Sequence, residues 1–195
     1  MNFRILTALV ALLATLPAQA LAHTGGDHVH SMASGLYHPF SGVDHPLAMA
    51  AVGLIAARLG GPALWRLPLA FIAAMVTGAA FAMAGMTMPL IETAILASVV
   101  LLGATLIANA NVPLALAVTG AAAFGCFHGF AHGAEGPAGA PVGYILGFIG
   151  GTATLHVAGI AACLKLARYG AVATAALRIA GAAIMGAGIG LAYFA

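Results

Sequence analysis

The sequence has very few charged side chains: six Lys or Arg and four Asp or Glu among 195 residues, or 5%. A soluble domain carries about 25% charged residues. So few charges could not cover the core of a soluble fold, and we therefore expect the lipid bilayer to be the solvent. No basic run and no aromatic platform is present, so nucleic acid is not an expected partner. The predicted fold class is an all-α, polytopic membrane protein.

Several motifs of enzymes and energy-coupled pumps are also missing. The chain has no H-E-x-x-H sequence and no G-x-x-x-x-G-K-[ST] sequence, so neither that type of metallohydrolase nor direct ATP drive is expected. Its two cysteines, Cys126 and Cys163, lie in apolar stretches without paired spacing, and we interpret them as core residues. We predict that the protein is not an enzyme and holds no permanently bound cofactor.

The amino-terminal 22 residues have the composition of a secretory signal peptide. Arg4 gives the positive start, residues 5–16 form a short apolar region, and Ala20-Leu21-Ala22 is a suitable cleavage site. The alternative is a short retained helix. Cleavage would leave residues 23–35 as a periplasmic arm, which either captures metal or is an ordinary solvated tail. The candidate metal ligands in this arm are His23, His28 and His30.

Six apolar segments follow, and each is long enough to cross a bilayer, which takes about 20 residues. Turn-forming Gly, Pro and Asn residues separate them. We predict that they form one transmembrane transport domain, residues 36–195, without a separate soluble domain. The expected spans are residues 36–59, 67–84, 89–108, 112–132, 142–164 and 171–194.

The basic residues predict how these spans are oriented. Cleavage of a signal peptide leaves the new amino terminus outside, so the loops after the first and fifth spans are expected to be cytoplasmic. Those loops carry Arg58, Arg66, Lys165 and Arg168, as the positive-inside rule requires. The predicted location is the bacterial inner membrane, with the mature amino terminus and the carboxyl terminus in the periplasm.

Histidine is the notable polar residue, with eight copies in the chain. One group is the run Phe127-His128-Gly129-Phe130-Ala131-His132-Gly133-Ala134-Glu135. His128, His132 and Glu135 are spaced i, i+4 and i+7, so they share one face of a helix, which suits the binding of one metal ion. The glycine after each histidine could let another helix or a hydrated ion come close. The structural alternative is a pair of histidines packed between helices.

The second group is His38-Pro39-Phe40-Ser41-Gly42-Val43-Asp44-His45. His38 and His45 share a face if the helix is continuous, but the prolines and the glycine of this region favour a broken or unwound segment. Such backbone occurs in membranes only where protein or a water-filled cavity covers it. Asp44 can bind a metal directly, or it can accept a hydrogen bond from an imidazole and fix its tautomer. The structural alternative is a helix cap with interfacial histidines.

Two further ionisable residues stand alone in predicted spans. His156 lies near the middle of the fifth span, where it is either part of an ion path or a structural hydrogen-bonding group. Glu92 lies near the start of the third span, where it is either part of the path or an interfacial carboxylate favoured by the helix dipole. Ionisable residues inside a bilayer are costly and usually functional, so both remain candidates.

The strings H-P-F-S-G-V-D-H and F-H-G-F-A-H-G-A-E resemble the two signature motifs of the HupE/UreJ family of bacterial nickel permeases, which are associated with hydrogenase and urease maturation. Both motifs are complete and occur in the expected order. The resemblance implies Ni²⁺ as the transported ion, although some relatives are assigned to Co²⁺. It implies that the transport-critical residues are His38, Asp44, His45, His128, His132 and Glu135.

The resulting hypothesis is a permease that imports Ni²⁺ and releases it to cytoplasmic nickel metallochaperones. Co²⁺ is the alternative cargo, because both ions accept imidazole and carboxylate. The alternative activity is an intramembrane metal-dependent hydrolase, in which a metal-bound water would attack a substrate. A b-type haem protein and a metal sensor without flux are two further alternatives.

Overall fold

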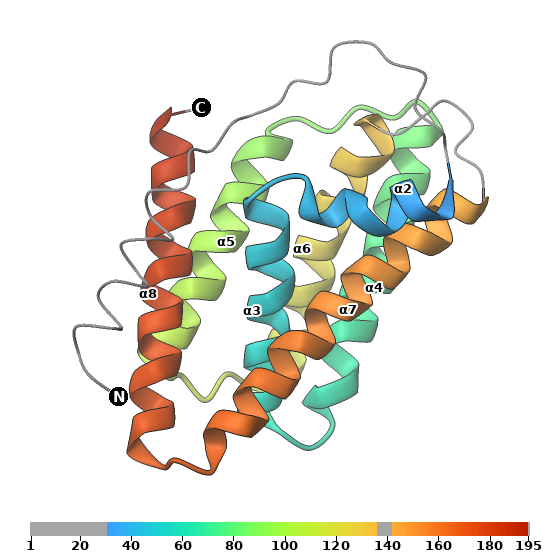
Figure 1. Cartoon of the computed structure of the whole chain (residues 1–195). Coiled ribbons are helices and arrows are strands. Elements are labelled where there is room, and N and C mark those ends of the chain that lie inside the picture. Colours follow the sequence, from blue (N-terminus) through green and yellow to red (C-terminus); the bar gives the residue numbers. More distant parts are fainter. Residues whose placement is uncertain (1–30, 136–141, 195) are drawn as a thin grey trace.

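The computed structural model describes residues 31–135 and 142–194, and every regular element in these ranges is a helix, as predicted. The predicted signal peptide and most of the histidine-containing arm lie outside the described residues. The long helices form one bundle, and a short helix, α2, lies across one end of it (Figure 1). The elements are α2 (Met32–Tyr37), the 3-10 helix η1 (His38–Phe40), α3 (Asp44–Leu59), α4 (Ala63–Met83), α5 (Ile91–Ala108), α6 (Leu114–Glu135), α7 (Val142–Ala167) and α8 (Ala171–Phe194).

Among the described residues, five helices are long and apolar enough to cross a membrane on their own, namely α4, α5, α6, α7 and α8. Their limits agree with the predicted spans within a few residues. The largest shift is in α4, which begins at Ala63 rather than at residue 67. The amide of Ala63 donates to the carbonyl of Gly60, and the amide of Leu64 donates to that of Gly61, so the turn continues directly into the helix.

The first predicted span is not one continuous helix. Residues 32–40 and α3 meet at a bend of 82°, so the chain crosses the membrane six times only if this bent pair forms one crossing. Pro39 lies at the start of η1, and Pro46 lies in the first turn of α3, the part of a helix that tolerates proline. The predicted break is therefore confirmed, and the condition under which His38 and His45 would share one helical face is not met.

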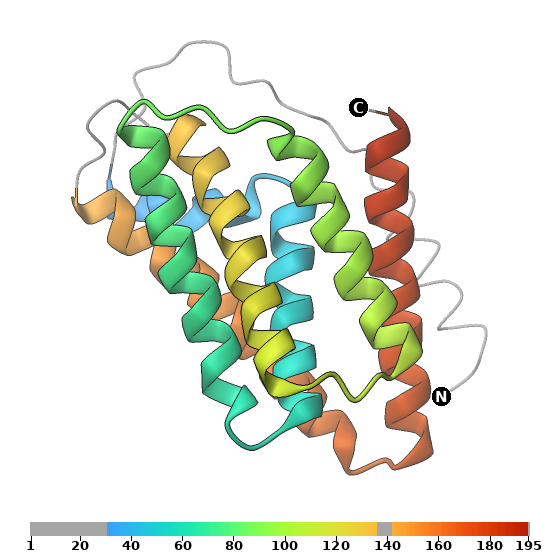
Figure 2. The ribbon, with the colours of Figure 1, turned by 180° about the vertical axis from the view of Figure 1, so that it is seen from behind.

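Helix α3 occupies the centre of the bundle (Figure 1). Its residues 51–57 are all buried, and it contacts α4, α5, α6, α7 and α8. Around it, α4 packs along α6 and α5 packs along α8, as the view from behind also shows (Figure 2). A helix that is apolar on most sides is typically buried in such a bundle. Because α3 is central, the residues of its first turn lie close to the surrounding helices.

Glycines set the close spacing between α4 and α6. A Cβ atom added at Gly129 would lie 1.9 Å from the carbonyl oxygen of Met75, and one at Gly125 would lie 2.2 Å from that of Phe71. Only glycine fits at these positions, as is common where membrane helices approach closely. Of the two roles predicted for the glycine after His128, the structure supports contact with another helix.

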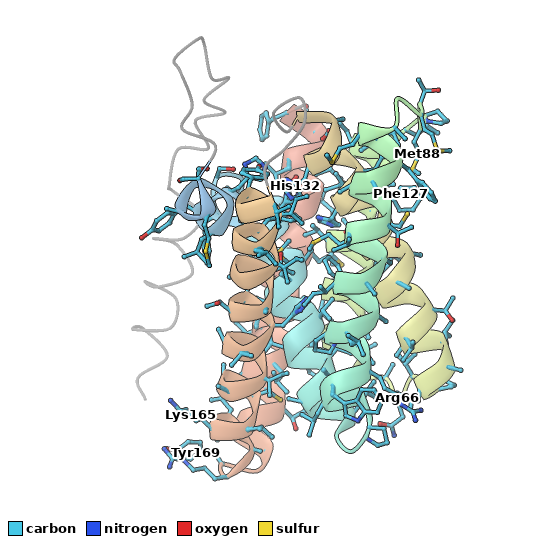
Figure 3. The ribbon with its side chains drawn as sticks, turned by 90° about the vertical axis from the view of Figure 1, so that its right-hand side faces the viewer. Arg66, Met88, Phe127, His132, Lys165 and Tyr169 are labelled. Carbon is cyan, nitrogen blue, oxygen red and sulfur yellow. The ribbon has the colours of Figure 1, made fainter. Side chains whose placement is uncertain are left out.

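The two ends of the bundle differ in charge. Arg66, Lys165 and Tyr169 lie at one end, whereas His132 and Met88 lie at the opposite end (Figure 3). We call the first of these the basic end. Arg58 closes the carboxyl end of α3, where its Nη1 donates to Oδ1 of Asn109 at 3.2 Å. This distribution agrees with the charge asymmetry predicted from the sequence.

Candidate metal-binding site

Four histidine rings from three elements meet inside the bundle, away from its basic end. His38 comes from η1, His45 from the first turn of α3, and His128 and His132 from α6. The ring centroids of His38 and His132 are 4.6 Å apart, those of His45 and His132 are 4.2 Å apart, and those of His45 and His128 are 4.7 Å apart. We call these four residues the four-histidine cluster. The two sequence runs therefore converge on one place.

The bend in the first span makes this convergence possible. It turns the chain by 82° between His38 and His45, so both rings contact His132 although they lie on different helices. On α6, the glycine face described above packs against α4, and the two histidines lie beside it. His128 is 0% exposed and His132 is 5% exposed, whereas His38 and His45 are half-buried, so the cluster extends from the protein interior toward its surface.

A hydroxyl fixes the tautomer of His128. The Ser98 hydroxyl donates to the carbonyl of Ile95 at 2.6 Å, and its oxygen lies 3.0 Å from Nε2 of His128. Because the hydroxyl hydrogen is already used, Ser98 accepts from Nε2–H, and the neutral ring carries its lone pair on Nδ1. That Nδ1 atom is buried without a hydrogen-bond partner. His128 therefore presents a buried nitrogen with an unused lone pair, the kind of atom through which histidine binds metals.

A carboxylate orients His45 in the same way. Nδ1 of His45 lies 2.7 Å from Oδ1 of Asp44, and the backbone amide of His45 donates to the same oxygen at 2.8 Å. A carboxylate only accepts, so Nδ1 carries the hydrogen and Nε2 carries the lone pair. Nε2 is also buried without a partner. Of the two roles predicted for Asp44, the geometry supports the one in which it orients an imidazole.

The remaining two histidines of the cluster bind each other. Nε2 of His38 lies 2.7 Å from Nδ1 of His132, so one of these nitrogens donates to the other. Nε2 of His132 is buried without a partner. Within the described ranges, no group of three His, Cys, Asp or Glu side chains is arranged to hold a metal ion at one point. One reason is that the facing nitrogens of His38 and His132 bond to each other and are not directed at a common point.

The other predicted ligands lie apart from the cluster or outside the described part of the chain. Glu92 is exposed in the first turn of α5, where the helix dipole favours a carboxylate. His156 is buried in α7, 1% exposed, and does not join the cluster. Helix α6 includes Glu135, but its side chain is outside the described part, as are His23, His28 and His30.

Sequence reasoning missed Ser98, which fixes the tautomer of His128. The signal was present, since Ser98 is the only serine after Ser41 and stands in the middle of an apolar span. A hydroxyl at such a position usually bonds to its own helix. Ser98 does so and also reaches α6, which the spacing of residues along one segment could not reveal.

A cavity of about 400 Å³ lies beside the cluster, between α4, α6 and α7. Its wall is almost entirely apolar, and the His132 ring is the main polar group on it. An apolar wall lowers the local dielectric constant, which strengthens electrostatic interactions at His132. The lining residues are Val76, Ala79, Ala80, Met83, Ala84, His132, Gly133, Tyr144, Ile145 and Phe148.

Comparisons with known proteins agree with the resemblance found in the two motifs. The profile of the family described as HupE / UreJ protein matches residues 10–191. The protein named "Protein HupE" from Rhizobium leguminosarum bv. viciae is 40% identical over 192 residues, which cover 98% of this chain and 98% of that protein. No solved structure matches the chain.

Proposed function

Because the chain belongs to the HupE/UreJ family, and because both of its histidine runs meet at one buried cluster, we propose that it is an inner-membrane importer of Ni²⁺. The ion is the cargo and is bound only in transit. The observation that supports this most directly is the pair of buried, unpartnered lone-pair nitrogens, Nε2 of His45 and Nδ1 of His128. Co²⁺ is the alternative cargo, because the same ligands suit it.

The hydrogen-bond partners of these rings prepare the cluster for a cation. A histidine binds a metal through a nitrogen without a hydrogen. Asp44 and Ser98 hold the hydrogens of His45 and His128 on the nitrogens that face away, so no tautomer change is needed when the ion arrives. The Asp44 carboxylate also places a negative charge beside the cluster, which favours a divalent ion in a medium of low dielectric constant.

The bond between His38 and His132 keeps binding reversible. The two nitrogens share a hydrogen at 2.7 Å, and an ion that bonds to both of them must displace this hydrogen and separate the rings. A first-row divalent ion lies about 2 Å from each imidazole nitrogen. The hydrogen bond therefore competes with the ion and lowers the net affinity, and a conduction path must release its ion after binding it.

The charge distribution supports an orientation of the bundle in the membrane, and the family resemblance to permeases supports import as the direction of transport. With Arg66 and Lys165 on the cytoplasmic side, the cluster lies toward the periplasm (Figure 3). The ion enters there, loses part of its hydration shell to the imidazoles, and leaves at the basic end, where nickel metallochaperones receive it. The mature amino terminus and the carboxyl terminus are then periplasmic.

Uptake of labelled nickel in cells tests this function. Cells that produce the wild-type chain should accumulate nickel, and His128→Ala should reduce uptake to the level of cells without the protein. Thr119→Ala, an exposed position on the same helix, is the matched control and should transport normally. A wild-type chain that gives no uptake above cells without the protein would contradict the import function, and unchanged uptake in the His128 variant would contradict the role of the cluster. Competition by Co²⁺, Zn²⁺ and Cu²⁺ then identifies the preferred cargo.

A further inference from the structure

The one other histidine in the described part of the bundle interior lies deeper than the four-histidine cluster. His156 is 1% exposed, and neither Nδ1 nor Nε2 has a hydrogen-bond partner. Buried imidazoles normally have a partner for at least one nitrogen. A purely structural histidine would be expected to use its hydrogen-bonding capacity, and this one does not.

The position of His156 relative to the cluster follows from α7. The Phe148 ring contacts His132, with 4.4 Å between the ring centroids. Thr152 and His156 follow Phe148 at intervals of four residues, so the three lie on one face of the helix. Eight residues of helix correspond to about 12 Å, and α7 continues from there to Lys165. His156 therefore lies about 12 Å further toward the basic end than Phe148, measured along the axis of α7.

One aromatic side chain lies between the four-histidine cluster and His156, which we call the outer and inner levels. The Phe71 ring on α4 lies 5.6 Å from the His128 ring and 5.2 Å from the His156 ring, measured between centroids. Phe71 itself is 0% exposed. Phe71 therefore lies between His128 and His156 and contacts both rings.

Two weak ligand groups lie between the levels. The Thr152 hydroxyl points at the Met75 sulfur, at 3.6 Å, and both side chains are 0% exposed. Other threonines of the bundle donate to their own helix, as Thr154 does to the carbonyl of Gly150. The Thr152 hydroxyl is directed into the bundle instead, where its oxygen and the thioether can contact a partly dehydrated ion.

The backbone of His156 is held firmly in place. A Cβ atom at Gly53 of α3 would lie 2.2 Å from the carbonyl oxygen of His156, and one at Gly159 would lie 2.3 Å from that of Ala50. Helices α3 and α7 therefore touch at this level, and the imidazole stays in the interior. The first turn of α3 carries His45, so the same helix supports both levels.

We propose that His156 is a second, inner binding position for the transported cation, which the ion reaches from the four-histidine cluster past Phe71. This inference rests on the proposed import function and adds a residue that the family motifs do not include. A single imidazole with Thr152 and Met75 binds an ion more weakly than several histidines do. The ion therefore passes through this position without being retained.

A leucine at this position separates ligand binding from packing. Uptake of labelled Ni²⁺ by the His156→Leu variant should fall at least about tenfold. Loss of a group that supports a metal site typically lowers affinity or activity by about 10–100-fold, and this expectation is the lower limit of that range. The purified variant should unfold at the same temperature as the wild type or at a higher one, because an apolar side chain replaces a polar one without partners. Its tightest equilibrium binding of Ni²⁺ should persist, because the cluster is intact.

Two further variants complete the test. His156→Gln keeps an oxygen that can bind the ion weakly, so its uptake should lie between those of the leucine variant and the wild type. Val157→Leu changes the next residue, which is 62% exposed on the outer surface of α7, and should transport normally.

Three results would overturn the inner position. They are normal uptake by His156→Leu, a lower unfolding temperature for that variant, and a glutamine variant that transports no better than leucine. If His128→Ala still abolishes uptake in the same cells, the import function stands and only the inner position fails. If the wild-type chain gives no more uptake than cells without the protein, the import function itself is wrong.

Discussion

The four-histidine cluster and His156 differ both in burial, since His38 and His45 are half-buried whereas His156 is fully buried, and in how their polar atoms are satisfied. In the cluster, His38 binds His132, Asp44 binds His45 and Ser98 binds His128. His156 has no hydrogen-bond partner on either ring nitrogen. Each ring of the cluster is therefore held by a hydrogen-bond partner, in three separate pairs, whereas His156 is held by packing.

This difference separates two requirements of a transport path. A site that captures a dilute ion needs several ligands in fixed orientations, and hydrogen bonds from neighbouring groups provide them. A site that passes the ion on must not hold it strongly. In the proposed import path, the broken first span would supply the first kind of site, because it brings two histidines to α6 from different directions. The continuous helix α7 would supply the second kind with one histidine.

The largest effect is expected from a change that disrupts the α4–α6 contact, because α6 carries His128 and α4 carries Phe71, whose ring packs against His156. In Gly129→Val, the new side chain would meet the Met75 carbonyl, since even a Cβ atom would lie 1.9 Å from this oxygen. Overpacking costs typically 1–3 kcal/mol, and the cost should be at the upper end because the contact is with backbone. The variant should give little folded protein and no uptake. Gly120→Ala, on the same helix with open space around it, should fold normally.

Equal yields of folded protein from these two glycine variants, measured by size-exclusion chromatography in detergent, would show that the α4–α6 contact does not hold the site. Uptake per folded molecule then becomes the informative quantity. A Gly129 variant that folds and transports normally would remove the argument that both levels depend on this contact.

A smaller effect, limited to the cluster, is expected from Asp44→Asn. The amide has almost the same shape, but it lacks the charge and can turn its NH₂ group toward Nδ1 of His45, which then loses its preferred tautomer. Loss of such a partner typically costs about 10–100-fold in metal affinity. Equilibrium binding of Ni²⁺ to the purified variant measures this, and Ser41→Ala, which changes an exposed hydroxyl of the same bend, is the control. Equal Ni²⁺ affinities in the two variants would mean that Asp44 does not contribute to metal binding at the cluster.

Much of this arrangement could be predicted from composition and spacing. Low charge predicted a membrane bundle, and the i and i+4 spacing of His128 and His132 predicted that both rings would face one site. These predictions succeed because they depend on helix geometry within one segment. The prolines likewise predicted that the first span would be broken near His38, since proline restricts the backbone locally.

The direction of the bend and the partners from other helices could not be predicted in this way. A proline shows where a helix can break, but the angle of 82° depends on how α2 and α3 pack against α7. Ser98 and Phe71 matter because α5 and α4 lie beside α6, which is a tertiary property. Glu92 illustrates the same limit, since its position in the first turn of α5 is exposed rather than directed at the cluster.

The smallest effect is expected from Ser98→Ala, which removes only the acceptor for Nε2 of His128. The ring keeps its place between α5 and α6, but its tautomer is no longer fixed, and a hydrogen bond is lost. A single hydrogen bond contributes about 0.5–1.5 kcal/mol, so Ni²⁺ affinity should fall between about twofold and tenfold. Thr105→Ala is the matched control on the same helix, because its hydroxyl donates only to the carbonyl of Leu101.

Calorimetric titration of both α5 variants with Ni²⁺ distinguishes a tautomer effect from a packing effect. If Ser98 acts through His128, the loss of affinity should disappear when His128→Ala is already present, because the two changes then remove the same interaction. Independent losses that add in the double variant would mean that Ser98 supports the bundle rather than the ligand. His128 would then resemble His156, because packing alone would hold its imidazole.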